Sequence, residues 1–191
     1  MDVSPDKRER ILQAASKLIV QNGLQCSMSA IAVEAGVATG SLYNYFKSKE
    51  DLVRGVYGRV AEVMTGRLAA EPEAGISHRD RIRRYIADYI DFIWEDPLRA
   101  RLFEYLDNNP LMTINEAGAI FSPFVDHSSA MLEAGQREGS VREGPASLMA
   151  SFVRGAIRNT LKRRRTNPAP LTVLEREQIA GMCWDAIAVH G

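Results

Sequence analysis

The sequence predicts an all-α protein of about nine helices. Along most of the chain, apolar residues recur at the three- and four-residue spacing of an amphipathic helix, and no segment alternates apolar and polar residues as a strand would. Glycines and prolines fall between these periodic segments, where helices begin and end. The composition suits an ordinary globular core, because 46% of the residues are hydrophobic and 25% are charged.

The N-terminal third contains the punctuation expected of short helices. The predicted helices cover about residues 6–22, 28–35, 39–46 and 49–70. Gly23 stands where a helix C-terminus favours glycine, and Gly36 ends the second helix. Ser48 and Asp51 form a capping box that opens the fourth helix.

The rest of the chain continues the helical pattern. The predicted helices cover about residues 77–96, 97–106, 113–138, 145–165 and 172–189. Within 113–138, the segment Thr113–Glu116 can cap one turn of helix, and Ser122-Pro123 can start or kink another. We predict two domains, residues 1–50 and residues 51–191, with the helix after Ser48 shared between the two halves.

Composition limits the functions that the chain can have. Lys plus Arg and Asp plus Glu each number 24, so any affinity for DNA has to come from local positive charge. Cys26 and Cys183 lie far apart and form no CxxC motif, so we expect two buried reduced thiols, no metal site and no cofactor. We see neither a signal peptide nor an apolar run approaching the roughly 20 residues of a membrane span, and expect a cytoplasmic protein without a membrane partner.

Residues 27–57 contain two short predicted helices joined by a tight turn. Gly36 can adopt the positive φ that such a turn requires, and Val37 supplies an apolar residue between the two helices. This arrangement is typical of a helix-turn-helix, in which the second helix lies in the major groove of DNA.

The second helix of this pair carries groups that suit DNA. It presents hydroxyls, an amide, aromatic rings and cations, and no acidic residue lies between Val37 and Lys49. Leu42 and Phe46 can anchor the helix to the core, which leaves the other side chains to face phosphates and base edges. In the alternative interpretation, the aromatic residues Tyr43, Tyr45 and Phe46 belong to the core and the lysines form a solvated face.

The pattern I-A-x-x-A-G-V-x-x-G-S-L-Y-x-Y-F-x-S-K-E-x-L resembles the DNA-binding domain of the TetR (tetracycline-repressor-like) family. The match covers Lys7 to about Tyr57, and the helical remainder agrees in length and helix count. The resemblance implies that residues at matching positions contact double-stranded operator DNA: Ser29, Thr39, Gly40, Ser41, Tyr43, Asn44, Tyr45, Lys47 and Lys49. Ala38 departs from the pattern, since Ser or Thr often caps the recognition helix there; the loss is about 1 kcal/mol unless Thr39 takes over the role.

The resemblance also implies a ligand pocket and a dimer interface in the C-terminal half. The pocket candidates are aromatic residues that can equally be plain core: Tyr85, Tyr89, Phe92, Phe103, Phe121 and Phe124. The interface candidates lie on the last two predicted helices: Phe152, Gly155, Ala156, Asn159, Ile179, Met182, Cys183 and Ala186. A homodimer is required functionally, because two recognition helices reach successive major grooves only when they lie about 34–36 Å apart. Arg154, Arg158 and residues 162–165 form a basic run that is either a second nucleic-acid patch or a solvated helix end.

Together these features predict a repressor that binds a palindromic operator as a homodimer and is released by a small lipophilic effector. Release requires the effector to prefer a conformer whose two DNA-binding domains are wrongly spaced. A DNA-binding regulator without small-molecule control, or an activator, remains an alternative. The catalytic patterns GxSxG and HExxH, the P-loop and GxGxxG are absent from the sequence, so we do not expect an enzyme.

Overall fold

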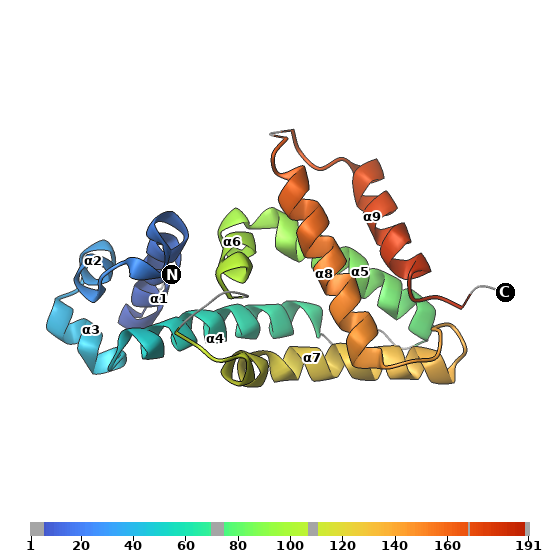
Figure 1. The fold of residues 1–191 in the computed structure, drawn as a ribbon, viewed down its shortest axis with the longest axis horizontal. Coiled ribbons are helices and arrows are strands. Elements are labelled where there is room, and N and C mark those ends of the chain that lie inside the picture. The colour runs from blue at the N-terminus through green and yellow to red at the C-terminus, as the bar shows by residue number, and fades with distance from the viewer. Residues whose placement is uncertain (1–5, 70–74, 107–110, 168, 190–191) are drawn as a thin grey trace. The chain divides into compact units, whose positions relative to one another are not determined.

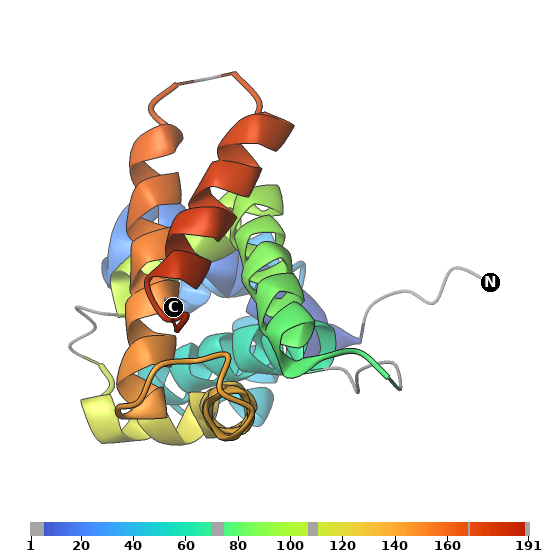
Figure 2. The same ribbon diagram turned by 90° about the vertical axis from the view of Figure 1, so that its right-hand side faces the viewer.

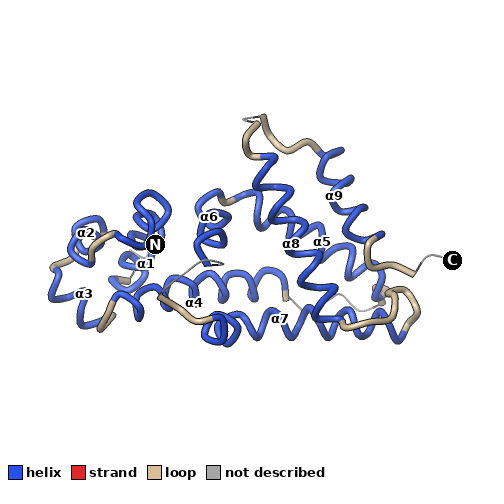
Figure 3. The backbone as a smooth tube through the Cα atoms, viewed as in Figure 1, coloured by secondary structure: helices blue, strands red, loops and turns tan. Residues whose placement is uncertain are grey.

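The computed structural model describes residues 6–69, 75–106, 111–167 and 169–189, and this part of the chain contains helices and connections without a strand (Figure 3). The helices are α1 (Lys7–Asn22), α2 (Met28–Glu34), α3 (Thr39–Tyr45), α4 (Lys49–Leu68), α5 (His78–Glu95), α6 (Pro97–Leu106), α7 (Ile114–Arg137), α8 (Ala146–Arg164) and α9 (Val173–Asp185). A 3₁₀ turn, Gly23–Gln25, follows α1. The all-α prediction is confirmed for these residues. None of the described helices has the combination of length and apolar character that crossing a membrane requires.

The chain divides into two compact units. The first comprises Met1–Val63 with Arg101–Phe121, and the second comprises Met64–Ala100 with Ser122–Gly191. Helices α4, α6 and α7 each contribute residues to both units. The two domains predicted from the sequence, residues 1–50 and 51–191, stay a prediction. The two compact units are defined by packing, and their boundaries fall inside these three helices.

In the first unit, α1, α2 and α3 gather around the start of α4 (Figure 1). Gly36 has a φ of 64°, as the predicted turn requires, and the Val37 amide donates to the Ala32 carbonyl at 3.0 Å. Ser27 caps α2 by accepting a hydrogen bond from the Ala30 amide at 3.1 Å. Helix α3 has Ala38 at its N-cap without a side-chain cap, and Thr39 is the first residue of the helix rather than its cap.

The start of α4 is capped as the sequence predicts. The Asp51 amide donates to Ser48 Oγ at 3.1 Å, and the Asp51 carboxylate accepts from the Lys47 amide at 3.0 Å. These two bonds fix the turn between α3 and α4, and they engage the Asp51 carboxylate.

In the second unit, α5 packs against α8 and α9, which lie side by side and are joined by a loop at one end (Figure 2). Helix α5 buries a regular stripe: Ile82, Tyr85, Ile86, Tyr89, Ile90, Phe92 and Ile93. Ser77 caps α5, and Thr172 with Glu175 forms a capping box at α9. These helices build the core of the second unit.

Two helices differ from their predicted extent. Helix α7 runs through Pro123 without a break, so the alternative in which a new helix starts there is wrong. Helix α9 ends at Asp185 rather than Val189. The residues after it pair with the loop that follows α7: the Arg142 amide donates to the Ile187 carbonyl at 2.9 Å, and the Val189 amide donates to Ser140 at 3.2 Å. This pairing satisfies backbone groups that a longer helix would have used internally.

Gly55 on α4 provides a test of how tightly the first unit is packed. A Cβ at this position would lie 2.7 Å from Phe46 Cε1 and 3.1 Å from Leu12 Cδ2, and both of these side chains are buried. Gly55→Ala should therefore lower the free energy of unfolding by about 1–3 kcal/mol through overpacking. Gly58→Ala, where a Cβ meets nothing within 4 Å, should raise it by about 0.5–1 kcal/mol. Urea denaturation measures both changes, and equal effects of the two substitutions would contradict the close packing at Gly55.

Candidate DNA-binding surface and C-terminal site

Helix α3 turns its polar residues outward because two apolar residues hold it to the core. Leu42 is 0% exposed and Phe46 is 3% exposed. The exposed members of the predicted DNA-contact set are Ser29, Thr39, Gly40, Tyr43, Asn44, Tyr45 and Lys47, whereas Ser41 and Lys49 are half-buried. Tyr43 and Tyr45 are 44% and 41% exposed, so the interpretation that places these two rings in the core is wrong, whereas it holds for Phe46.

Acidic groups near this surface are already engaged. Lys17 Nζ lies 2.5 Å from Glu34 Oε1 at the end of α2, and Asp51 accepts from the backbone. The pKa of Glu50 is lowered, chiefly by hydrogen bonds from the backbone. Pairing of the acids reduces their repulsion of a phosphate backbone.

Two cations near the helix-turn-helix were missed by the sequence reasoning. The Arg8 guanidinium lies over the Phe46 ring, 5.6 Å from its centroid, and Arg10 Nη1 lies 4.0 Å from where a Cβ of Gly36 would stand. The basic run at the start of α1 was the available signal. Arg54 on α4 is a different case, because its guanidinium donates to Glu116 at 2.8 and 3.0 Å and is therefore committed to an ion pair.

The structure divides the candidate pocket residues between the two units. Tyr85, Tyr89, Phe92 and Phe124 form one buried aromatic cluster in the second unit, with ring centroids 6.1–6.5 Å apart. Phe103 and Phe121 contact each other in the first unit at 5.9 Å. We therefore restrict the term aromatic cluster to the four residues of the second unit.

Polar groups reach the aromatic cluster from α7 and α8. Ser128 is 0% exposed, and Arg154 Nη1 donates to its Oγ at 2.9 Å. The same guanidinium lies over the Phe124 ring, 5.5 Å from the centroid. Burial raises the pKa of Tyr85, an effect opposed by the nearby positive charge of Arg154. No group of three or more metal-ligating side chains with metal-binding geometry occurs among the described residues.

The candidate interface residues separate into exposed and buried groups. Phe152 and Met182 are 57% and 62% exposed, and Asn159 is also exposed. Gly155, Ala156 and Ala186 are half-buried. Ile179 and Cys183, at 6% and 4% exposure, belong to the core of their own subunit instead. The sequence reasoning missed Leu148 and Leu174, which are 65% and 64% exposed and lie on the same two helices.

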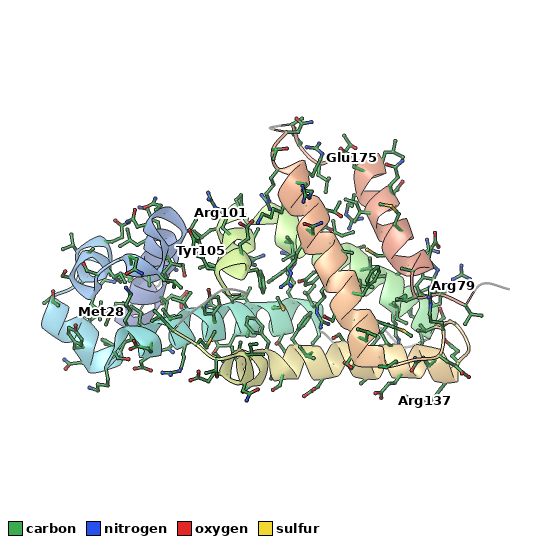
Figure 4. The ribbon with its side chains drawn as sticks, in the orientation of Figure 1. Met28, Arg79, Arg101, Tyr105, Arg137 and Glu175 are labelled. Carbon is green, nitrogen blue, oxygen red and sulfur yellow. The ribbon has the colours of Figure 1, made fainter. Side chains whose placement is uncertain are left out.

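The basic run at the end of α8 holds the second unit together. Arg164 donates to Glu175, labelled on the first turn of α9 in Figure 4, at 2.6 and 3.0 Å. Arg165 donates to the carbonyls of Ile93 and Trp94 at 2.6 and 2.7 Å, at the C-terminus of α5. These contacts agree with the interpretation of the run as a helix end whose cations interact with the helix dipole and with nearby acids. They also occupy two cations that a second nucleic-acid patch would need.

The fold and the exposed face of α3 define a helix-turn-helix protein. Residues 11–56 match the family described as bacterial regulatory proteins, tetR family. The chain is 25% identical over 158 residues to the fatty acid metabolism regulator protein of Bacillus subtilis, covering 81% of each chain. It is 26% identical over 141 residues to the transcriptional repressor KstR2 of Rhodococcus jostii, covering 71% of this chain and 68% of that protein.

A solved structure shows the same fold over nearly the whole chain. AibR, crystallised with isovaleryl coenzyme A and operator DNA, superimposes with a TM-score of 0.72 at 20% identity, covering 93% of this chain and 96% of AibR. Residues 11–56 therefore form a DNA-binding segment of the kind found in the tetR family, and the chain resembles transcriptional regulators of that family over most of its length. It is therefore a DNA-binding transcriptional regulator, and its relatives are regulators rather than enzymes.

The placement of Cys183 gives a prediction about thiol reactivity. Burial raises the pKa of Cys183 to about 11, so its thiol stays protonated near neutral pH, and the thiolate is the reactive form. We expect native Cys183 to react with iodoacetamide at least about a hundredfold more slowly than in urea, where the pKa returns towards ~8.5. Peptide mass spectrometry after timed labelling measures both rates. Labelling of the native protein at the unfolded rate would show that Cys183 is accessible.

Proposed function

We propose that this regulator is a repressor that binds a palindromic operator as a homodimer and is released by a small lipophilic effector bound in the second unit. The observation that carries the DNA-binding part is the acid-free outer face of α3, which Leu42 and Phe46 hold away from the core. The curated relative KstR2 is named as a repressor, which supports the sign of the regulation.

The proposed DNA contacts follow from side-chain chemistry. Tyr43 and Ser41 donate hydroxyl hydrogen bonds to phosphates, and Lys49 adds a positive charge at the N-terminus of α4. Asn44 has an amide that can pair with a base edge in the major groove, and Thr39, Gly40 and Tyr45 adjoin it on the same short helix.

Tyr43 and Lys49 can be separated by the salt dependence of DNA binding. Lys49→Ala should weaken DNA binding. It should also reduce the magnitude of the slope of log affinity against log salt concentration by about 1, because one fewer counterion is released when the variant binds DNA. Tyr43→Phe removes only a neutral hydroxyl, so affinity should fall about fivefold with an unchanged slope. Fluorescence anisotropy on the intergenic DNA beside the protein's own gene, at several salt concentrations, measures both.

Arg83→Ala is the matched control for this experiment, since Arg83 is an exposed cation on α5, in the second unit. It should leave both the affinity and the slope close to those of the wild type. An unchanged slope in Lys49→Ala would contradict a phosphate contact by that residue. Loss of binding in the control to the same extent would mean that charge in general, and not this surface, governs DNA binding.

The proposed dimer interface is an exposed apolar face on α8 and α9. Leu148 and Phe152 lie one turn apart on α8, and Leu174 and Met182 are exposed on α9. Exposed apolar patches of this kind mark interaction surfaces, and helices with small residues such as Gly155 and Ala156 can approach a partner closely. A second copy of the chain fits this face, because an operator palindrome requires two recognition helices related by a two-fold axis.

Phe152→Glu tests this interface. A charge buried in an apolar interface is strongly unfavourable, so we expect the variant to sediment as a monomer at concentrations where the wild type is a dimer. Ile114→Glu is the control, because Ile114 is 90% exposed but lies on α7 in the first unit and on neither α8 nor α9. Sedimentation velocity measures the oligomeric state of both variants. A dimeric Phe152→Glu protein would show that the interface lies elsewhere.

The effector part of the proposal rests on the aromatic cluster of the second unit. Helix α4 runs without a break from Lys49 in the first unit to Leu68 in the second, so a ligand-dependent change can be passed along one helix. An effector weakens operator binding only to the extent that it prefers the conformer that does not fit DNA. A regulator without small-molecule control would keep its operator affinity in the presence of every ligand tried.

A further inference from the structure

We infer that Arg154 binds the carboxylate of a lipophilic monoanion whose apolar part packs against the aromatic cluster. This inference rests on the proposed effector function and specifies the chemical class of the effector. Arg154 contacts the carboxylate of the ligand and determines selectivity. The rings of Tyr89 and Phe124 contact the apolar part of the ligand.

The contacts of Arg154 place a cation beside aromatic rings. Its guanidinium donates to Ser128 Oγ, which lies in the core, and stands over the face of Phe124. Ser128 in turn donates to the Val125 carbonyl at 2.9 Å. The guanidinium has five N–H donors, and one is used by this serine, so donors remain for a ligand.

The other arginines that stand over the aromatic cluster are neutralised. Arg67 and Arg99 both lie over Phe92, but Arg67 is paired with Glu95 at 2.5 Å and Arg99 with Asp96 at 3.2 Å. Arg154 forms no ion pair with a carboxylate in the described part of the chain. A half-buried cation without a counterion is unfavourable, and an anionic ligand would supply the missing charge.

The hydroxyl of Tyr85 offers a second donor next to Arg154. Its oxygen is buried and has no hydrogen bond of ordinary geometry among the described residues, although Arg154 and Ser128 lie near enough to affect its titration. A carboxylate has two oxygens and accepts from both a guanidinium and a hydroxyl. The arrangement therefore matches a planar carboxylate better than it matches an alcohol or an amide.

The single positive charge of Arg154 limits the ligand to one negative charge beside this residue. One unpaired guanidinium balances one carboxylate, whereas the phosphates of a coenzyme A thioester would need several cations. The surrounding rings favour an aliphatic or aryl tail. A straight-chain fatty acid and an aryl alkanoate share this chemistry, and the experiment below separates them.

The test measures ligand binding by the full-length dimer in the absence of DNA. Isothermal titration calorimetry compares dodecanoate, dodecanol, phenylbutyrate and dodecanoyl-coenzyme A. We expect at least one of the two carboxylates to bind, and the tighter of them to bind about tenfold or more tightly than dodecanol. Arg154→Gln should weaken that carboxylate about ten- to a hundredfold and leave dodecanol unchanged.

Two further variants keep the result interpretable. Arg154→Lys retains the charge and should keep part of the preference for the carboxylate, which a merely structural role for Arg154 would not predict. Arg163→Gln lies on the same helix and is exposed, so it should bind as the wild type does. Thermal melting of Arg154→Gln confirms that the comparison is made on folded protein.

Several outcomes would overturn the inference. These are equal affinity for dodecanoate and dodecanol, unchanged carboxylate binding by Arg154→Gln, absence of binding by either carboxylate, or tight binding of the coenzyme A thioester that does not depend on Arg154. Operator binding by the same preparations separates this inference from the proposed function. A protein that binds its operator but neither carboxylate overturns the inference alone, whereas a protein without operator affinity overturns the repressor proposal itself.

Discussion

Burial of the Phe46 ring is the interaction on which the DNA-binding surface depends. The ring closes the C-terminal end of α3, lies against Gly55 of α4 and is covered by the Arg8 guanidinium. Leu42, one turn earlier, fixes the same side of the helix. With these two side chains inside, the other side of a helix as short as α3 has to face solvent. The exposure of Tyr43 and Asn44 is thus a consequence of packing, whereas the absence of an acidic residue from the outer face is a property of the sequence itself.

In the second unit, contacts of charged side chains hold the helices together. Its arginines tie helices together: Arg164 joins α8 to Glu175 of α9, Arg165 caps the end of α5, and Arg176 on α9 pairs with Asp91 on α5. Each of these cations has an acid or a carbonyl as its partner, so the framework carries little uncompensated charge. Arg154 stands apart from this pattern because its partners are a serine hydroxyl and an aromatic face. The same unit therefore contains both a framework of paired arginines and the cation that we propose as the ligand-binding residue.

Most of the fold could be predicted from the sequence, because caps and hydrophobic spacing are local signals. Ser27, Ser48 and Ser77 each begin a helix as their capping chemistry predicts. The end of α9 could not be predicted, since it depends on pairing between Val189 and Ser140, which are distant in sequence. The outward face of α3 followed from Leu42 and Phe46, but the division of Phe103 from Tyr89 required the tertiary structure. The sequence analysis did not foresee that Ile179 and Cys183 are buried whereas Met182 is exposed. Composition alone does not tell which side of a helix an apolar residue occupies when apolar residues lie on several sides.

We propose that two copies of α3 read a palindrome. Selection of binding sites from random-sequence DNA by the wild-type protein tests this proposal, because the selection presupposes neither an operator nor an effector. We expect enrichment of an inverted repeat whose half-sites have centres about one helical turn, or a small multiple of it, apart. Enrichment of a site without two-fold symmetry, or of no sequence at all by a folded dimer, would contradict it.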